Sequence, residues 1–387
     1  QNETILSPKK RKDIVNYEKV TFTLEQQYID FLRTNNLITI RYSLLGLDYI
    51  YTEAVTLHEL FSIDDIKLPH LKNSFSVDEK IARIDTINNI VVFNPGEILI
   101  EKDLIIPENY LVIAEAGTHL NLVNSSMIVS FSPVEFIGTS DFPITIFSSD
   151  TTGQGIVCIS TDRSSLLQHV IFSNIESPST RDWALTGAVT FYEANLTAKH
   201  CLFRNIRSED ALNVIRSNYE IEDSHFIETS SDAFDADYSI GLITNTRFVN
   251  CGNDAIDVSG GEIILESVFI EGAGDKAISA GEQSYLIGDN IKIYNSEISV
   301  ACKDLSQVIL NNITIESGRI GYTAYQKKSE YGPGSIKVTT NNVHDTEIPY
   351  LIELGSTMSN NGEDIKSNHE GVEKMLYGNV YGKASGG

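Results

Sequence analysis

Three aspartates, Asp235, Asp237 and Asp257, are spaced so that their carboxylates could act together. Asp257 lies 22 residues after Asp235, and Asp237 lies two residues after Asp235. In a chain that coils once every 22 residues, these side chains would share one face, roughly 5–7 Å apart. Like charges at that separation cannot all stay ionised without a shared proton, a cation or a metal. The expected chemistry is therefore binding of Ca²⁺ or acid–base catalysis by carboxyl groups of unlike protonation.

A 22-residue repeat supports such coiling. The matched segments are Glu209–Asn213, Ser231–Asp235, Asn253–Asp257, Asp275–Ser279, Glu297–Ala301 and Arg319–Thr323. A fixed period in the twenties is typical of a solenoid, in which each repeat is one turn of chain stacked on the last. Residues 22 apart should then lie above one another at the strand spacing of about 4.8 Å.

The apolar positions of the repeat predict which side chains face the core. Leu212 and Val214 each begin a row of mostly small or aliphatic residues that recurs at the same step. Both rows should point inward because side chains alternate along a strand, so the position between them should point outward. The outward row is Asn213, Asp235, Asp257, Ser279, Ala301 and Thr323.

Basic and aromatic residues follow on the same flank in later repeats. Lys276 takes the position that Asp232 and Asp254 hold in the preceding repeats, and Lys303 stands three repeats beyond Asp237. Glu282 and Asp304 form a further acidic pair that is 22 residues apart. The other flank residues are Arg216, Tyr238, Tyr322, Tyr325, Lys327 and Lys328. A sugar chain that lay along this flank would meet acidic, basic and aromatic groups.

Each of these residues also has a structural interpretation. The row of Asp210, Asp232 and Asp254 directly precedes a strand, where an aspartate often bonds to the backbone of a turn. Lys276 would then neutralise the aspartates of that row, and Lys327 and Lys328 would be a solvated pair. The tyrosines would pack in the core or under a cap instead of stacking on sugars.

The chain is expected to have three parts. Residues 1–92 are expected to form an N-terminal α+β cap or accessory domain, with helices opening at Thr23–Gln26 and Ser76–Glu79 and paired strands between residues 37 and 51. Residues 93–345 alternate short apolar strands with Gly, Asn, Pro and Ser, which is typical of all-β structure. Residues 346–387 are expected to be a C-terminal capping segment or tail.

Composition excludes several classes of partner. The 387 residues carry a formal charge of −24, which argues against nucleic acid as a partner because phosphate binding needs a basic face. The sequence contains no run of about 18 apolar residues, so no membrane span is predicted. The four cysteines form no metal-binding pattern, and Cys302, which falls in the second apolar row, is expected to be a buried thiol.

The repeat Asn253-Asp-Ala-Ile-Asp-Val-Ser-Gly260 resembles the coils of the pectate-lyase-like superfamily. The resemblance covers roughly residues 93–345 and implies a right-handed, single-stranded parallel β-helix that acts on polysaccharides. The pair of segments Asn253–Asp257 and Gly274–Ser279 is similar to two coils of polygalacturonases. However, Lys276 stands where that family has a second aspartate, and the Gly-His-Gly and Arg-x-Lys motifs are missing.

Polysaccharide lyases of the superfamily hold Ca²⁺ with carboxylates and remove a sugar C5 proton with Lys or Arg. By this resemblance the metal ligands would be Asp235, Asp237, Asp257 and Glu282. The catalytic residues would be Lys276, Lys303, Arg216, Asp235 and Asp257. The substrate-binding residues would be Asp304, Tyr238, Tyr325, Lys327 and Lys328.

The favoured hypothesis is a secreted or periplasmic lyase that cleaves an acidic polysaccharide by metal-assisted β-elimination. A glycoside hydrolase that uses Asp235, Asp237 and Asp257 is the first alternative, and a C5-epimerase is the second. A non-catalytic glycan-binding or surface-assembly protein is the alternative from another class. The sequence leaves the sugar, the linkage, endo or exo action and the oligomeric state open.

Overall fold

The computed structural model describes residues 38–43, 50–55, 74–180, 183–367 and 369–378. The chain divides into two compact units, residues 1–67 and 68–387. In the first unit, β1 (Ile38–Ser43) and β2 (Ile50–Val55) form an antiparallel pair, as expected for this stretch. The helix expected from Thr23 lies outside the described residues.

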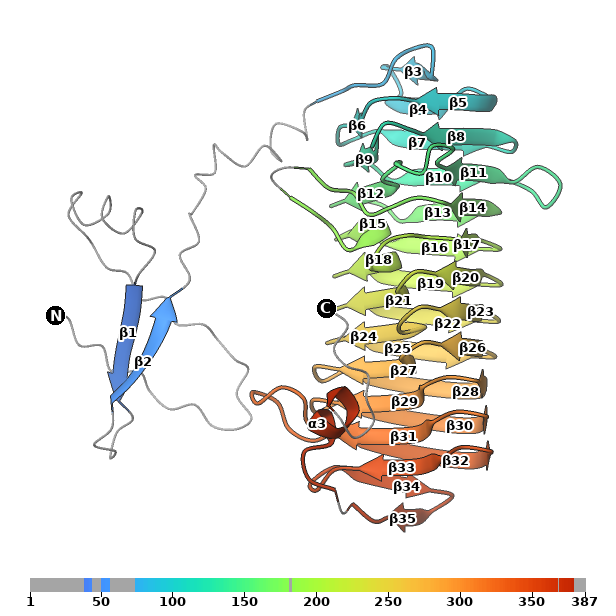
Figure 1. Cartoon of the computed structure of the whole chain (residues 1–387). Helices are drawn as coiled ribbons and strands as arrows, with labels where there is room; N and C mark the ends of the chain where they lie inside the picture. Colours follow the sequence, from blue (N-terminus) through green and yellow to red (C-terminus); the bar gives the residue numbers. More distant parts are fainter. Residues whose placement is uncertain (1–37, 44–49, 56–73, 181–182, 368, 379–387) are drawn as a thin grey trace. The chain divides into compact units, whose positions relative to one another are not determined.

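The second unit is a parallel β-solenoid, which confirms the predicted fold class (Figure 1). A complete coil contains three short strands, such as β18 (Asp210–Ile215), β19 (Asn218–Glu222) and β20 (His225–Thr229). The next coil repeats them as β21 (Asp232–Asp237), β22 (Ile240–Thr244) and β23 (Arg247–Cys251). Each strand pairs in parallel with its equivalent in the next coil.

The first strand of each coil contributes to an eleven-stranded sheet that carries the candidate site. Besides β18 and β21, its strands in the described residues are β6 (Leu104–Ile106), β9 (Ile128–Ser130), β12 (Ile156–Ile159), β15 (Gly187–Tyr192), β24 (Ile256–Ser259), β27 (Lys276–Gly281), β29 (Ile298–Lys303), β31 (Ile320–Tyr325) and β33 (Ile348–Ile352). Asn213 pairs with Asp235, and Asp235 pairs with Asp257, so the predicted vertical register is confirmed.

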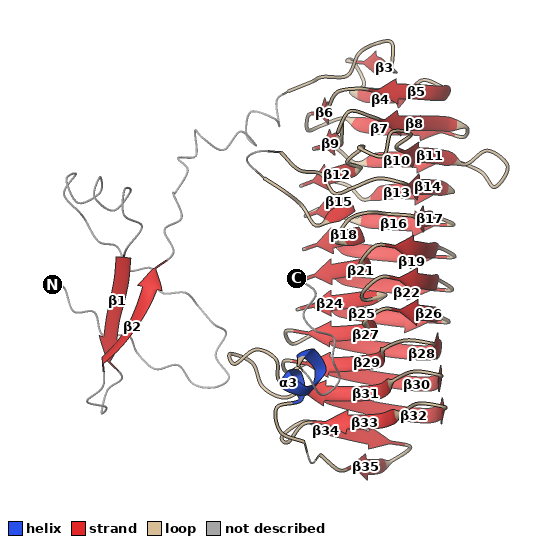
Figure 2. Cartoon of the chain, viewed as in Figure 1, coloured by secondary structure: helices blue, strands red, loops and turns tan. Residues whose placement is uncertain are grey.

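The remaining strands of the second unit form one continuous sheet around the rest of each coil (Figure 2). Before β19 they are β3 (Ala82–Asp85), β4 (Ile90–Phe93), β5 (Gly96–Ile100), β7 (Leu111–Glu115), β8 (Thr118–Leu122), β10 (Val134–Ile137), β11 (Ile144–Phe147), β13 (Ser165–Gln168), β14 (Val170–Ser173), β16 (Leu196–Lys199) and β17 (Leu202–Arg204). After β23 they are β25 (Glu262–Glu266), β26 (Phe269–Ala273), β28 (Tyr285–Tyr294), β30 (Gln307–Glu316), β32 (Ser335–His344), β34 (Thr357–Asn360) and β35 (Glu363–Ile365).

The solenoid extends beyond the expected boundaries at both ends. β4 pairs in parallel with β7, so coil structure begins before residue 93. β33 and β34 continue the two sheets past residue 345, and a short helix, α3 (Val372–Tyr377), follows.

The prediction of a helix at Ser76–Glu79 is wrong. Asp78 accepts a hydrogen bond from the Lys80 amide in a turn, and the Ser76 hydroxyl bonds to the first coil instead.

The core is filled by the inward rows that the sequence predicts. Leu212, Phe234, Ile256 and Ile278 are fully buried. On the opposite wall a ladder of stacked phenylalanines runs through four coils, with centroid separations of 5.0, 4.5 and 4.8 Å. Cys302 is buried, as expected, and all four cysteines are free thiols. Because every coil repeats these contacts, the outward positions are held in fixed register.

Candidate functional site

The outward face of the eleven-stranded sheet carries the candidate site. In β21 the outward positions are Asp232, Asp235 and Asp237, since Ala233, Phe234 and Ala236 between them are buried. The spacing of three and then two coincides with a gap in the pairing, where Ala211 of β18 and Ala233 of β21 are both unpaired while the register stays at 22 residues. One strand therefore presents three carboxyl groups on one side of the solenoid.

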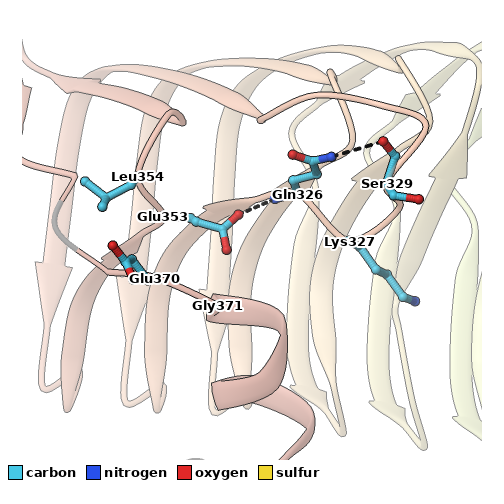
Figure 3. A pocket seen from close by; sticks show the side chains of 7 residues that line it. All are labelled: Gln326, Lys327, Ser329, Glu353, Leu354, Glu370 and Gly371. Atoms are coloured by element: carbon cyan, nitrogen blue, oxygen red, sulfur yellow. Dashed lines mark hydrogen bonds between the residues drawn. The ribbon is translucent and has the colours of Figure 1, made fainter. Parts of the chain in front are cut away.

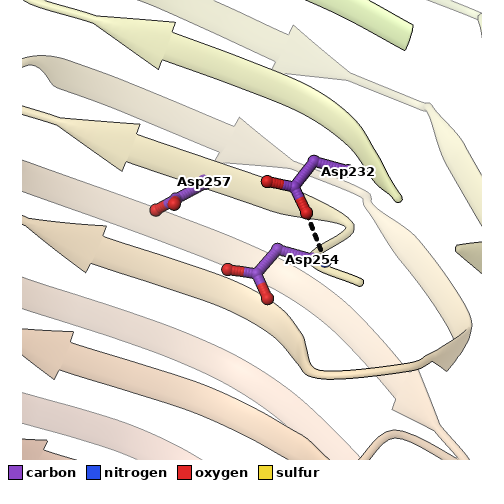
Figure 4. A group of neighbouring side chains, drawn as sticks. All are labelled: Asp232, Asp254 and Asp257. Carbon is purple, nitrogen blue, oxygen red and sulfur yellow. Dashed lines mark hydrogen bonds between the residues drawn. The ribbon is translucent and has the colours of Figure 1, made fainter. Parts of the chain in front are cut away.

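A cluster of carboxylates spans β21 and β24, as Figure 4 shows for three of its members. Oxygen atoms of Asp232, Asp254 and Asp257 all lie within 4.8 Å of one another. Asp232 Oδ1 also accepts a hydrogen bond of 2.8 Å from the Asp254 amide, and Asp254 Oδ1 accepts one of 2.9 Å from the Lys276 amide. These backbone bonds agree with the structural interpretation of that row. The sequence reasoning nevertheless left Asp232 and Asp254 out of the expected metal ligands, although their 22-residue spacing could have included them.

Lys276 places a buried positive charge directly against this cluster. Its Nζ lies 3.3 Å from both carboxylate oxygens of Asp254 and 2.6 Å from Asp275 Oδ2. The residue is only 4% exposed. Burial opposes its charge, but Asp254, Tyr377 and Asp275 raise the pKa of Lys276 well above its ordinary value. Lys276 therefore acts as a fixed cation.

Lys303 reaches the same cluster from the far side. It stands two coils above Asp257, and its Nζ lies 3.8 Å from Asp257 Oδ1. The glycine between them, Gly281, makes this possible: a Cβ at that position would lie 3.0 Å from Lys303 Cε. Burial opposes the charge, but Asp257 raises the pKa of Lys303 above its ordinary value. Both lysines predicted to act in the site are therefore beside the carboxylates, and both are engaged.

The pKa values of the carboxyl groups in the cluster are shifted in opposite directions. Burial disfavours the charge of Asp257, but Lys303 and Lys276 outweigh it and lower the pKa of Asp257 below its ordinary value. For Asp235, burial and then the charges of Asp210 and Asp237 raise the pKa well above its ordinary value. Burial and neighbouring carboxylates also raise the pKa of Asp232 to about 8 and that of Asp237 to about 6. A carboxyl group of lowered pKa thus stands next to carboxyl groups of raised pKa.

Asn213 links the acids of neighbouring coils. Its Nδ2 donates to Asp235 Oδ2 at 2.8 Å and to Asp210 Oδ2 at 2.9 Å. The side chains of Asp235 and Asp257 are half-buried, with that of Asp257 22% exposed. Solvent can therefore reach part of each side chain, although Asp257 Oδ1 is buried.

Of the two predicted residues at the rim, Tyr238 lies next to the carboxylates and Arg216 does not. Tyr238 is 60% exposed at the end of β21, next to the carboxylates. Arg216 extends away from them, to the Tyr192 hydroxyl at 3.0 Å and to Glu193 at 3.5 Å. Of these, Tyr238 is the one positioned to touch a ligand above the aspartates.

The remaining predicted residues lie toward the C-terminal end. Glu282 forms an ion pair with Lys328. Asp304 is buried, and its Oδ1 accepts hydrogen bonds of 2.7 Å from the amides of Lys327 and Lys328, so it holds the loop that follows β31. Tyr325 is fully buried beneath α3, so its ring packs under a cap, which was the structural alternative.

The donor set is a poor match for Ca²⁺, which takes six to eight oxygen ligands. Of the four expected ligands, Asp257 faces Lys303 and Glu282 faces Lys328. In the trio of Asp232, Asp254 and Asp257, which could be an alternative set of ligands, both carboxylate oxygens of Asp254 face Lys276. A calcium ion would have to displace ammonium groups that already neutralise these carboxylates. We therefore derive no step through a metal.

Two pockets in the described residues lie away from the carboxylates. One of about 370 Å³ is bordered by Gln326, Glu353 and Gly371, beside the start of α3 (Figure 3). Another of about 450 Å³ lies over the second sheet, between His200, Arg247 and Phe269.

Comparisons with known proteins give likenesses of fold at low sequence identity. No family model matches the chain, and no curated protein matches it in sequence. The catalytic domain of a GH87 alpha-1,3-glucanase in complex with tetrasaccharides is similar over 72% of this chain, at 12% identity and a TM-score of 0.37, and this chain spans 65% of its length.

Two other solved structures show a likeness of the same degree. The periplasmic alginate epimerase AlgG is similar over 76% of this chain and 82% of its own, at 11% identity and a TM-score of 0.36. A tailspike of the Acinetobacter baumannii bacteriophage Fri1, a capsular polysaccharide depolymerase, is similar over 76% of this chain and 66% of its own. The sequence identity is 11% and the TM-score is 0.38.

Asp237 generates a prediction about stability and pH. A carboxyl group whose pKa is raised on folding contributes stability below its unfolded value of 3.8 and loses it as the pH rises through the folded value of about 6. Asp237→Asn stays neutral, so its Tm should exceed that of the wild type by a few degrees at about pH 7 and converge with it near pH 4. Thermal unfolding across this range measures the effect; a constant difference at every pH would contradict the assignment.

Proposed function

We propose that the protein is a glycoside hydrolase that binds a polysaccharide on the outward face of β21 and β24. The observation that carries this proposal is the pairing of Asp235 with Asp257 on neighbouring strands, with Lys303 Nζ 3.8 Å from Asp257 alone; the lysines lower the pKa of Asp257, whereas burial and neighbouring carboxylates raise that of Asp235. Two carboxyl groups of unlike protonation are what hydrolysis of a glycosidic bond requires. The exposed ring of Tyr238 at the rim offers a surface on which a sugar can pack.

In this proposal the two aspartates divide the proton transfers. Asp235 donates its proton to the leaving glycosidic oxygen as the bond to the anomeric carbon breaks. Asp257, held ionised by Lys303 and Lys276, accepts a proton from the water that attacks that carbon. One water is consumed, and the two products are a new reducing end and a free hydroxyl. Asn213 orients the Asp235 carboxyl group through its 2.8 Å hydrogen bond.

The charge on the floor of the site favours an uncharged glycan. Lys276 and Lys303 are both buried and paired with aspartates, so among the described residues of the floor they offer no free cation to a sugar carboxylate. The pKa of each is raised, which also makes it a poor base for removing a C5 proton. These contacts support hydrolysis over the β-elimination that the sequence favoured.

The second candidate is the metal-assisted lyase acting on an acidic glycan. Its support is the close trio Asp232, Asp254 and Asp257, whose oxygens could be rearranged around Ca²⁺ if the lysines moved. Secretion or a periplasmic location is proposed for either enzyme, because polysaccharides of this kind lie outside the cytoplasm. None of the described helices is long and apolar enough to cross a membrane.

The two aspartates provide a direct test of hydrolysis. Asp257→Asn and Asp235→Asn should each lower turnover by about 10²–10⁴-fold, because each removes one proton transfer. Asp289→Asn, on an exposed position of β28, is the matched control and should keep wild-type activity. Release of reducing ends from neutral and acidic polysaccharides measures turnover, and absorbance of unsaturated sugars is read in parallel. Unsaturated products, or full activity in Asp257→Asn, would overturn the proposal.

Removal of divalent cations separates the two candidates. The lysines already neutralise the cluster, so a chelator should leave both turnover and Tm of the wild type unchanged. The assay is repeated with EDTA and then with added Ca²⁺. Loss of turnover that Ca²⁺ restores, with the fold intact, would favour the lyase.

A further inference from the structure

The central outward row of the eleven-stranded sheet changes from apolar to polar and back along the solenoid. Its members, in register from β6 to β33, are Ile105, Val129, Val157, Thr190, Asn213, Asp235, Asp257, Ser279, Ala301, Thr323 and Leu351. An apolar side chain on an outward position indicates that something covers it. The covers at the two ends define how much of the face is open.

The N-terminal cover is a long connection between coils, of which the structure describes residues 174–180 and 183–186. The chain leaves β14 at Ser173 and reaches β15 only at Gly187, whereas β20 ends at Thr229 and β21 begins at Asp232. Trp183 and Leu185 from this connection pack on Val129 and Val157. Bonds from Leu185 N to Pro178 O at 2.9 Å and from Thr180 N to Trp183 O at 2.7 Å hold it together.

This cover extends to the edge of the carboxylates. Asn213 Nδ2 lies 3.3 Å from the hydroxyl of Thr186, which follows the connection. Thr190 and Asn213 are each only 1% exposed. The floor is therefore closed up to and including β18.

The C-terminal cover is α3, which Figure 1 draws across β29 and β31. Val372 and Leu376 of the helix pack on Ala301 and Leu351. Glu353 fixes its start, since one carboxylate oxygen accepts from the Val372 amide at 3.1 Å and the other from the Gln326 amide at 2.7 Å (Figure 3).

Tyr377, the last residue of α3, stands at the inner edge of this cover. Its ring centroid lies 5.8 Å from Lys276 Nζ and 5.4 Å from Lys327 Nζ, and its hydroxyl is 3.4 Å from that of Tyr325. Ser279, the next outward residue after Asp257, is fully buried. The floor is therefore closed again from β27 onward.

We propose that the binding cleft is closed at both ends and takes the terminal segment of a glycan chain, so that the enzyme acts on chain ends. This inference rests on the proposed hydrolysis and adds its mode of action. The open floor lies between the covered strands β18 and β27, which are three strand spacings or about 14 Å apart. One wall is a helix about 10 Å across with its side chains. A long polymer cannot lie along the solenoid axis through both walls, whereas a chain end can enter between them.

Thiol labelling tests the closure without relying on activity. The four native cysteines are buried, so an introduced cysteine is the reactive one. Asp235→Cys places it on the floor, and Glu220→Cys, at a half-exposed outward position of β19 that neither cover reaches, is the matched control. Each variant is treated with a methanethiosulfonate and with a biotin maleimide bound to streptavidin, after its Tm is shown to match the wild type.

Both variants should react with the methanethiosulfonate. The streptavidin-bound maleimide should label Glu220→Cys but should not label Asp235→Cys. Equal bulky labelling at the two positions would overturn the closed cleft even if hydrolysis is confirmed. On a polymer that the wild type hydrolyses, reducing ends should appear as short sugars while viscosity stays high. An early fall in viscosity would overturn end-directed action, whereas a protein that releases no reducing ends would contradict the proposed hydrolysis and leave the labelling result standing.

Discussion

The site depends on the neutralisation of a buried ladder of aspartates by two lysines. Stacking acidic residues at the strand spacing is unfavourable, because their charges repel one another in surroundings that water screens poorly. Lys276 meets the ladder at its end, and Lys303 reaches Asp257 across Gly281. The attraction is unequal, so the pKa of Asp257 is lowered while that of Asp235 is raised. A repeated coil with aspartates stacked from one turn to the next thereby acquires two carboxyl groups of different character.

Most of the solenoid could be predicted from the sequence because its period is visible in the side chains. A step of 22 residues and two apolar rows predict parallel strands, their register and the outward position of Asp235 and Asp257. Pairing confirms the first two, and burial of the residues on either side of each aspartate confirms the third. The ends were predicted less well. The segment that begins at Ser76 has the pattern of a helix cap, but the Ser76 hydroxyl bonds to the first coil. This is a tertiary contact that the local sequence does not predict.

The sequence predicted part of the site and missed the contacts between its residues. Register placed the carboxylates and the lysines on one flank, but it does not show that Lys303 spans two coils, because that reach depends on the lack of a side chain at Gly281. Tyr325 was expected to meet sugar, yet α3 folds back over it from more than forty residues later in the chain. A repeat reports which residues are stacked, whereas the covers come from segments outside the repeat.

The most direct test of this account is the titration of individual carboxyl groups by NMR, with carbon-13 in the aspartate side chains and Asp235→Asn and Asp257→Asn for assignment. The account predicts that Asp257 is ionised at pH values at which Asp235 still carries its proton, and that Lys303→Met raises the pKa of Asp257. Ordinary titration of both groups near the unshifted value of 3.8 would contradict it, because no acid and base would then stand side by side.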